Sequence, residues 1–180
     1  MTEGSETGLR FEDITTSGVL LENISLVYTV KNPLTFIYNA TTPYDWYTDN
    51  ESFQNNTLWG DGTDKNAFDP CPINWRVPQD GTWNDFSTTT FPYFIQGSQA
   101  SSGNYNAGNG RQYNQISWFP ATGFRPYANG ALSSIGSRGT YWPASVSDIY
   151  AKYLRFTMND ISPNNISYRA YGFSVRCIQE

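Results

Sequence analysis

The segment at residues 69–78, DPCPINWRVP, constrains this chain more than any other part of it. Its three prolines fix φ and remove backbone donors, so the segment predicts a rigid corner rather than a helix or a strand. Trp75 and Val77 are two residues apart, a spacing that places both side chains on one side of an extended segment. Cys71 in this corner and Cys177 near the end of the chain are the only two cysteines. We therefore interpret the corner and the C-terminal segment as the two ends of one clasp that encloses most of the chain.

Composition and charge exclude several classes of protein. At 180 residues the chain fits one domain with an adequate core. Its 16 acidic and 11 basic residues leave a net charge of −5, which argues against nucleic-acid binding because that normally needs a basic patch. No apolar run approaches the length that spans a bilayer. The chain has no histidine, so catalysis through a histidine base and histidine-ligated zinc or iron are excluded.

The acidic residues of the first half are predicted to bond to backbone rather than to carry chemistry. Asp61, Asp64, Asn66 and Asp69 carry oxygen atoms of the kind that calcium prefers, but their spacing does not match an EF-hand loop. The aspartates lie in predicted turn or cap positions, where the side chain usually bonds to nearby backbone. A carboxylate pair for glycoside hydrolysis is therefore not expected. We predict no catalytic residue, no metal site and no cofactor.

Motifs at the corner and at the end of the chain resemble one bacterial family. The corner is preceded by LWGDG at residues 58–62, and later parts of the chain carry YW at 141–142, AKYLRF at 151–156 and GFSVRCI at 172–178. Together these motifs resemble the Fibrobacter succinogenes major paralogous domain family, which is abundant in gut Bacteroidetes, over residues 26–180. The resemblance implies a C-type-lectin-like fold on a surface-exposed or secreted protein. It does not imply a known ligand.

The expected fold class is therefore α+β: a C-type-lectin-like domain with two short helices, a twisted antiparallel sheet and long loops. Residues 1–17 are expected to be a flexible lead-in and residues 18–180 the single domain. Because the resemblance places the chain outside the cytoplasm, we expect a Cys71–Cys177 disulfide, with two reduced, buried cysteines as the alternative. On the loop-entropy account, such a bond would stabilise the fold by roughly 4–5 kcal/mol.

Local patterns predict where the elements lie. Part of the segment 18–38 is expected to be strand, with a short helical turn that starts near Pro33 in the family. A second helix is expected to begin at residues 80–82, with Trp83 and Phe86 on one face. The remaining expectations are strands at 111–119, 139–142, 153–156 and 168–178, the last two paired antiparallel, a long loop at 96–111, and a polar loop at 159–167.

Recognition through a face formed late in the sequence is the function that these exclusions leave. By resemblance to ligand-binding members of this fold, that face would present Tyr105, Asn106, Tyr113, Tyr141, Trp142, Ser145, Asp148, Tyr150, Asn164, Asn165 and Tyr168. Tyrosine gives a large contact area at low entropy cost, Asn and Ser give adaptable hydrogen bonds, and aromatic faces stack on sugars. The alternative for Trp142 and for several of the tyrosines is burial in the core.

We therefore predict a non-catalytic binding or adhesion module, extracellular or on the surface of a bacterium or a virion. Its partner is a glycan or a protein on a cell surface; nucleic acid and a membrane span are not expected, and an oligomer is compatible with the sequence. The composition of residues 141–168 is also compatible with the variable proteins of diversity-generating retroelements, which use this fold. The alternative is a structural subunit of a surface appendage or a phage virion, with a carbohydrate-active enzyme as a distant third.

Overall fold

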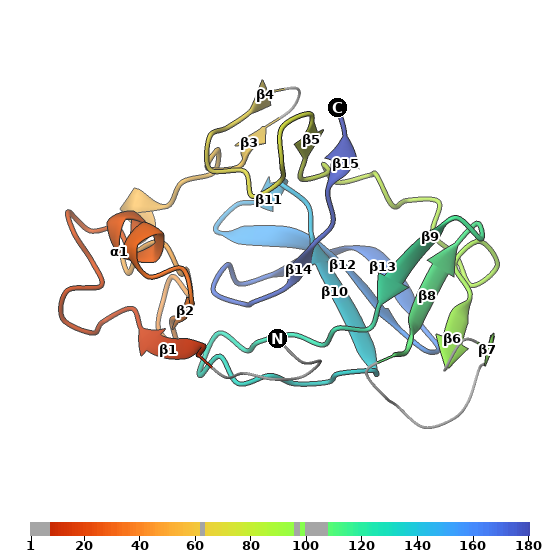
Figure 1. Cartoon of the computed structure of the whole chain (residues 1–180). Coiled ribbons are helices and arrows are strands. Elements are labelled where there is room, and N and C mark those ends of the chain that lie inside the picture. The colour runs from red at the N-terminus through yellow and green to blue at the C-terminus, as the bar shows by residue number, and fades with distance from the viewer. Residues whose placement is uncertain (1–7, 62–63, 96–97, 100–107) are drawn as a thin grey trace.

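The computed structural model describes residues 8–61, 64–95, 98–99 and 108–180 of the chain (Figure 1). Short strands joined by long connecting segments dominate it, with 35% strand against 6% helix. The helical elements of the described residues are α1 (Leu26–Lys31) and the 3₁₀ turn η1 (Glu51–Phe53). The strands are β1 (Arg10–Asp13), β2 (Thr35–Tyr38), β3 (Gly60–Asp61), β4 (Asp64–Lys65), β5 (Trp75–Arg76), β6 (Tyr93–Ile95), β7 (Ser98–Gln99), β8 (Gly110–Tyr113), β9 (Ser117–Pro120), β10 (Arg138–Trp142), β11 (Val146–Ser147), β12 (Tyr150–Thr157), β13 (Ile161–Ser167), β14 (Ser174–Val175) and β15 (Ile178–Gln179).

The expected α+β fold with two short helices is wrong, because the described chain is mostly β-sheet and its longest helix, α1, has six residues. The helical turn expected near Pro33 does not form. Instead α1 ends at Lys31, two residues before the proline, since a proline disfavours helical backbone in the residue that precedes it. Asn32 caps the helix: its backbone N–H donates to the carbonyls of Tyr28 and Thr29. The chain then turns directly into β2.

The second expected helix is replaced by a series of turns over residues 79–86. Gly81 has a φ of 85°, which lies in the left-handed region and does not continue into a right-handed helix. Asp80 does not act as an N-cap, because its carboxylate pairs with the ammonium of Lys152 on β12. The left-handed backbone of Gly81 and the ion pair of Asp80 together outweigh the helical spacing of the two aromatic residues in this segment.

The main core lies between two sheets (Figure 1). The larger sheet has the order β11-β12-β10-β14, with β13 also paired to β12, and the smaller has the order β7-β6-β8-β9. Aromatic rings fill the space between them and meet edge to face, as Phe91 and Phe156 do at 5.2 Å and 85°. The buried members of this core are Trp83, Phe86, Phe91, Tyr93, Phe119, Ala121, Tyr141, Leu154, Phe156 and Met158.

Arg111 on β8 is an exception inside this core, since it is fully buried and bonds to backbone instead of to a carboxylate. Its guanidinium donates to the carbonyls of Thr157 at 3.0 Å and Met158 at 2.8 Å, and also to the carbonyl of Phe91. Burial lowers the pKa of Arg111 to about 10. The side chain thus ties β8 to the end of β12 from within the core.

Several strand predictions needed correction. The strand expected at 139–142 is confirmed as β10. The strand expected at 111–119 is instead the hairpin β8–β9. Its three-residue connection, residues 114–116, places Asn114 and Gln115 at positive φ values of 45° and 60°, which tight hairpin connections commonly use. The pairing expected between 153–156 and 168–178 is wrong, because β12 pairs antiparallel with β13.

Strand β13 (Ile161–Ser167) takes up most of the segment 159–167 that was expected to be a polar loop. Its pairing partner in the described chain is β12 alone, which leaves it at an edge, where Pro163 removes no needed ladder bond. Segment 168–178, expected as one long strand, contains only the two-residue strand β14 and leads into β15. Residues 168–173, which belong to no named strand, contribute to the candidate site described below.

The N-terminal part of the described chain packs against the domain through a second, smaller core. Strand β1 pairs parallel with β2, and Ile14, Val19 and Ile37 are buried together. Packing therefore begins within residues 1–17, the segment expected to be a flexible lead-in. None of the helices in the described ranges combines the length and the apolar character that a membrane crossing requires.

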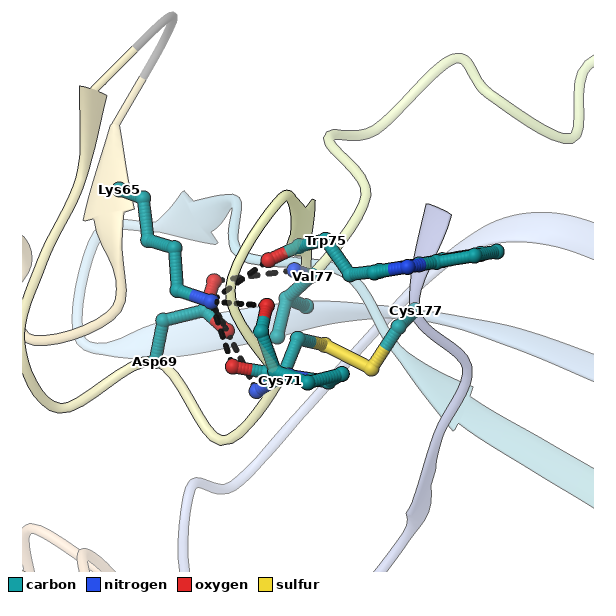
Figure 2. The surroundings of a disulfide bond; sticks show 7 residues. Lys65, Asp69, Cys71, Trp75, Val77 and Cys177 are labelled. Carbon is teal, nitrogen blue, oxygen red and sulfur yellow. Dashed lines mark hydrogen bonds and ion pairs between the residues drawn. A yellow bond between two sulfur atoms is a disulfide. The ribbon is translucent and has the colours of Figure 1, made fainter. Parts of the chain in front are cut away.

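The expected clasp is present as a Cys71–Cys177 disulfide (Figure 2). Next to it β5 and β15 pair antiparallel, with Arg76 opposite Ile178. Trp75 and Val77 do not share one environment, as the spacing had suggested: Trp75 is 42% exposed and Val77 is 2% exposed.

Lys65 and Asp69 organise the corner around this disulfide (Figure 2). The ammonium of Lys65 donates to the backbone carbonyls of Pro72 at 2.8 Å and Trp75 at 2.6 Å, and also to the carbonyl of Cys71. The two carboxylate oxygens of Asp69 accept the backbone N–H groups of Cys71 at 2.7 Å and Val77 at 2.9 Å. A proline-rich loop with few backbone bonds of its own is therefore held by two charged side chains.

Candidate functional site

Five tyrosines from four segments of the chain gather into one cluster, which we name the tyrosine face: Tyr44, Tyr127, Tyr150, Tyr168 and Tyr171. Tyr168 lies at its centre, with ring centroids 4.2 Å from Tyr44, 5.0 Å from Tyr127 and 5.5 Å from Tyr150. The ring of Tyr127 continues the cluster to Tyr171 at 5.1 Å. All five side chains are partly exposed, so the cluster packs against itself while it presents a surface.

Backbone hydrogen bonds hold together the segments that carry these rings. The N–H of Ala170 donates to the carbonyl of Tyr44 at 2.9 Å, and Arg125 and Gly172 exchange two backbone bonds of 2.9 Å each. Tyr127 follows two residues after Arg125 on the same segment. Tyr44 itself has a φ of 57°, a left-handed conformation that a bulky residue keeps only when its surroundings impose it. The rings are therefore positioned before any ligand arrives.

Burial among neighbouring rings changes the chemistry of these phenols. It raises the pKa of Tyr168 and of Tyr171 above the ordinary value of 10.0, and neighbouring tyrosines raise both further. In the part of the chain that the structure describes, the hydroxyls of the five tyrosines form no hydrogen bond with one another or with other groups. At neutral pH Tyr168 and Tyr171 thus offer neutral hydroxyls that can donate and accept.

A pair of adjoining cavities lies beside the tyrosine face, and both are lined by Trp46, Trp59, Trp142 and Arg169. We name the pair the tryptophan cavity. The larger part has a volume of about 310 Å³ and the smaller about 80 Å³. The residues that line the larger part include members of α1, β2, β10 and β14, elements that are labelled in Figure 1. Tyr171 also lines it, so the cavity and the tyrosine face share a border.

A buried ion pair forms the polar end of the tryptophan cavity. Arg169 is 8% exposed and Asp45 is 1% exposed, with Nη1 3.8 Å from Oδ2. Nη2 of Arg169 donates to Asn56 Oδ1 at 2.6 Å and to the carbonyl of Asp148 at 2.8 Å, whereas its Nε has no partner among the described residues. Burial raises the pKa of Asp45. The backbone N–H of Tyr47, the side-chain amide of Gln54 and the positive charge of Arg169 all act to lower it.

The predicted binding residues are divided by the structure. Tyr150 and Tyr168 belong to the tyrosine face, and Trp142 lines the tryptophan cavity although it is mostly buried. Tyr141 is a core residue whose hydroxyl donates to the carbonyl of Pro120 at 2.7 Å. The backbone of Asp148 serves the cavity as an acceptor for Arg169. Tyr105 and Asn106 lie outside the described residues.

The remaining predicted residues bond to neighbouring turns and strands instead of joining this site. These pairs are Tyr113 with Asp85, Asn164 with Asn84, Ser145 with Asp80, and Asn165 with the carbonyl of Ser162. They are placed on the surface by the fold, but the structure does not bring them together with Tyr150 and Tyr168.

Sequence reasoning missed five of the residues that build the site: Tyr44, Tyr127, Tyr171, Trp46 and Trp59. The aromatic run PYDWY at residues 43–47 was a signal, since it places three rings in a turn region. What the sequence did not show is that this early segment packs against residues 168–172.

The acidic segment weighed as a calcium site has a different role where it is described. Asp69 uses its carboxylate for two backbone N–H groups, and the ammonium of Lys65 lies 3.9 Å from Oδ1. The side chains of Asp61 and Asp64 lie outside the described part. Within that part, no group of three His, Cys, Asp or Glu residues could hold a metal ion.

Comparison with models of known families, with curated proteins and with solved structures finds no match to this chain.

Proposed function

We propose that this chain is a non-catalytic binding or adhesion module, displayed outside the cytoplasm, that recognises a glycan or a protein through its tyrosine face. The observation that carries the proposal is the packing of five partly exposed tyrosine rings from four segments, held by backbone hydrogen bonds. Such rings present apolar area and a polar hydroxyl with only two side-chain torsions to order. Because they are already positioned, binding would cost little further ordering.

The sequence resemblance supports the part of this proposal that places the protein outside the cytoplasm. Surface display on a bacterium or a virion suits a disulfide-bonded domain, since disulfides persist in oxidising surroundings. The narrower version, a variable protein of a diversity-generating retroelement, has its own test. Sequencing the locus in many isolates would have to show substitutions concentrated at residues 141–168.

The proposal is tested by screening the purified domain on glycan and protein arrays. A ligand is then titrated against Tyr150→Ala, Tyr150→Phe and Tyr113→Ala, the last being a matched tyrosine that lies away from the face. We expect Tyr150→Ala to weaken binding at least tenfold, Tyr150→Phe to weaken it less, and Tyr113→Ala to leave it unchanged. Equal effects of the two alanine variants, with folding intact, would contradict the assignment of the face.

A second candidate function, a structural subunit that packs against copies of itself, is favoured by a different surface. Phe68, Ile73 and Trp75 are exposed large apolar residues close together in sequence at the disulfide corner, and exposed apolar clusters mark interaction sites. Sizing by light scattering distinguishes the candidates: a multimer that Ile73→Ser converts to monomer supports the subunit, whereas a monomer at all concentrations removes it.

A further inference from the structure

We propose that the tryptophan cavity is a sugar subsite that takes one uncharged pyranose unit of a glycan. This inference rests on the proposed binding function and specifies its ligand class. The indoles of Trp46, Trp59 and Trp142 line both parts of the cavity. The C–H groups on one face of a pyranose are apolar and pack on an aromatic ring, which offers a broad surface of matching shape.

The charged side chains of the cavity are Asp45, which lines the smaller part, and Arg169, which lines both parts. Asp45 and Arg169 line the smaller part together with Asn55 and Asn56. Each oxygen of Asp45 accepts one hydrogen bond, from the N–H of Tyr47 at 2.9 Å and from Gln54 at 2.8 Å, although a carboxylate offers about four acceptor positions.

Arg169 is likewise not saturated, because its buried Nε lacks a partner among the described residues. Leaving a buried polar group with unused capacity is unfavourable. Neighbouring hydroxyls of a sugar both donate and accept. One ring at the border of the two parts can therefore serve the guanidinium of Arg169, which lines both parts, and the carboxylate of Asp45, which lines the smaller part.

The ion pair also selects against charged ligands. Arg169 and Asp45 compensate each other within 3.8 Å, so the polar end carries no net charge. An acidic sugar would be attracted by Arg169 but repelled by the carboxylate of Asp45. A protonated amino sugar would be attracted by Asp45 but repelled by Arg169. The larger part, about 310 Å³, lies at the lower end of ligand pockets, which fits one ring rather than a long chain.

The test is a calorimetric and fluorescence titration of the native domain with neutral mono- and disaccharides, with glucuronic acid and glucosamine as charged counterparts. Trp59→Ala removes one wall. Thr29→Phe, on α1 at the rim of the larger part, fills space without deleting a core side chain. Trp75→Ala is the matched control, because this tryptophan lies at the disulfide corner and does not line the cavity. Thermal melting verifies that each variant folds.

We expect a neutral sugar to bind and to quench tryptophan emission, with affinity at least tenfold lower in Trp59→Ala and Thr29→Phe and unchanged in Trp75→Ala. Binding that depends on Tyr150 but not on these two variants would overturn the subsite and leave the proposed function standing. The subsite is also overturned if free indole or an aromatic peptide binds there and sugars do not, or if no neutral sugar binds at concentrations on the order of 10 mM. Loss of all binding on the arrays would remove the proposed function itself.

Discussion

Removing the Cys71–Cys177 bond should cost this domain a large part of its stability. The two cysteines are separated by 106 residues, and closing a loop of that length lowers the entropy of the unfolded chain by an amount equivalent to about 5 kcal/mol at 25 °C. The free energy of unfolding of a domain is usually roughly 5–15 kcal/mol. The variant with both cysteines changed to serine is therefore expected to be marginally folded, and native protein in reductant should behave in the same way.

Urea unfolding followed by tryptophan fluorescence measures this loss. With a slope of about 2 kcal/mol per molar urea, the midpoint should fall by roughly 2.5 M. The slope itself should rise on reduction, because the unfolded chain without the cross-link exposes more surface. The double serine variant provides the control, since reductant must leave its curve unchanged. A loss below about 2 kcal/mol with an unchanged slope would refute the loop-entropy reasoning.

Three further outcomes follow from the described contacts. Lys65→Met should lower the free energy of unfolding by about 2 kcal/mol, because three backbone carbonyls lose a charged donor. The control Lys152→Met removes a surface ion pair and should lower it by under about 1 kcal/mol. Equal urea midpoints for the two variants would contradict this difference. Carboxyl NMR titration should place the pKa of Asp45 above 3.8, because burial disfavours its charge, and that of Asp80 below 3.8, because Lys152 bonds to it. As pH falls from the raised folded pKa of Asp45 to 3.8, protonation of Asp45 should therefore increase the free energy of unfolding. As pH falls from 3.8 through the lowered folded pKa of Asp80, the stabilising contribution of Asp80 should be lost. The reverse order of the two pKa values would refute both causes. Gly139→Ala should lower the melting temperature by several degrees, because the added Cβ would lie 2.1 Å from a ring carbon of Phe156; an unchanged melting curve would show that the ring moves freely.

The sequence predicted best those features that depend on covalent or short-range constraint. The disulfide is one example, because the chain has only two cysteines and the family resemblance implied an oxidising setting. Strand β10 is the other, because its β-branched and aromatic residues favour extended backbone locally. The two helices failed for local reasons too. Gly81 takes left-handed backbone beside the helically spaced Trp83 and Phe86, and α1 ends before Pro33 instead of a helical turn starting there, as the family resemblance had implied.

Strand β13 and the tyrosine face could not have been read from local sequence. Residues 163–165, Pro-Asn-Asn, favour a turn, and only the ladder with β12 makes them extended. In the same way, Tyr44 and Tyr168 are distant in the chain and meet because Ala170 bonds to the backbone of the early loop. A tyrosine-rich composition predicted the chemistry of a surface but not which tyrosines share it.

The clasp and the tryptophan cavity are parts of one structure. Pro70 and Val175 both line the larger part of the cavity, and they lie one and two residues from Cys71 and Cys177. The disulfide therefore fixes two walls that come from opposite ends of a long stretch of chain. Val175 is also held by the pairing of β14 with β10, whereas Pro70 lies in a loop. The cross-link therefore ties this loop wall to the sheet and limits its independent movement. Reduction should therefore loosen the binding site as well as destabilise the fold, since whatever binds only the closed cavity also stabilises the closed clasp.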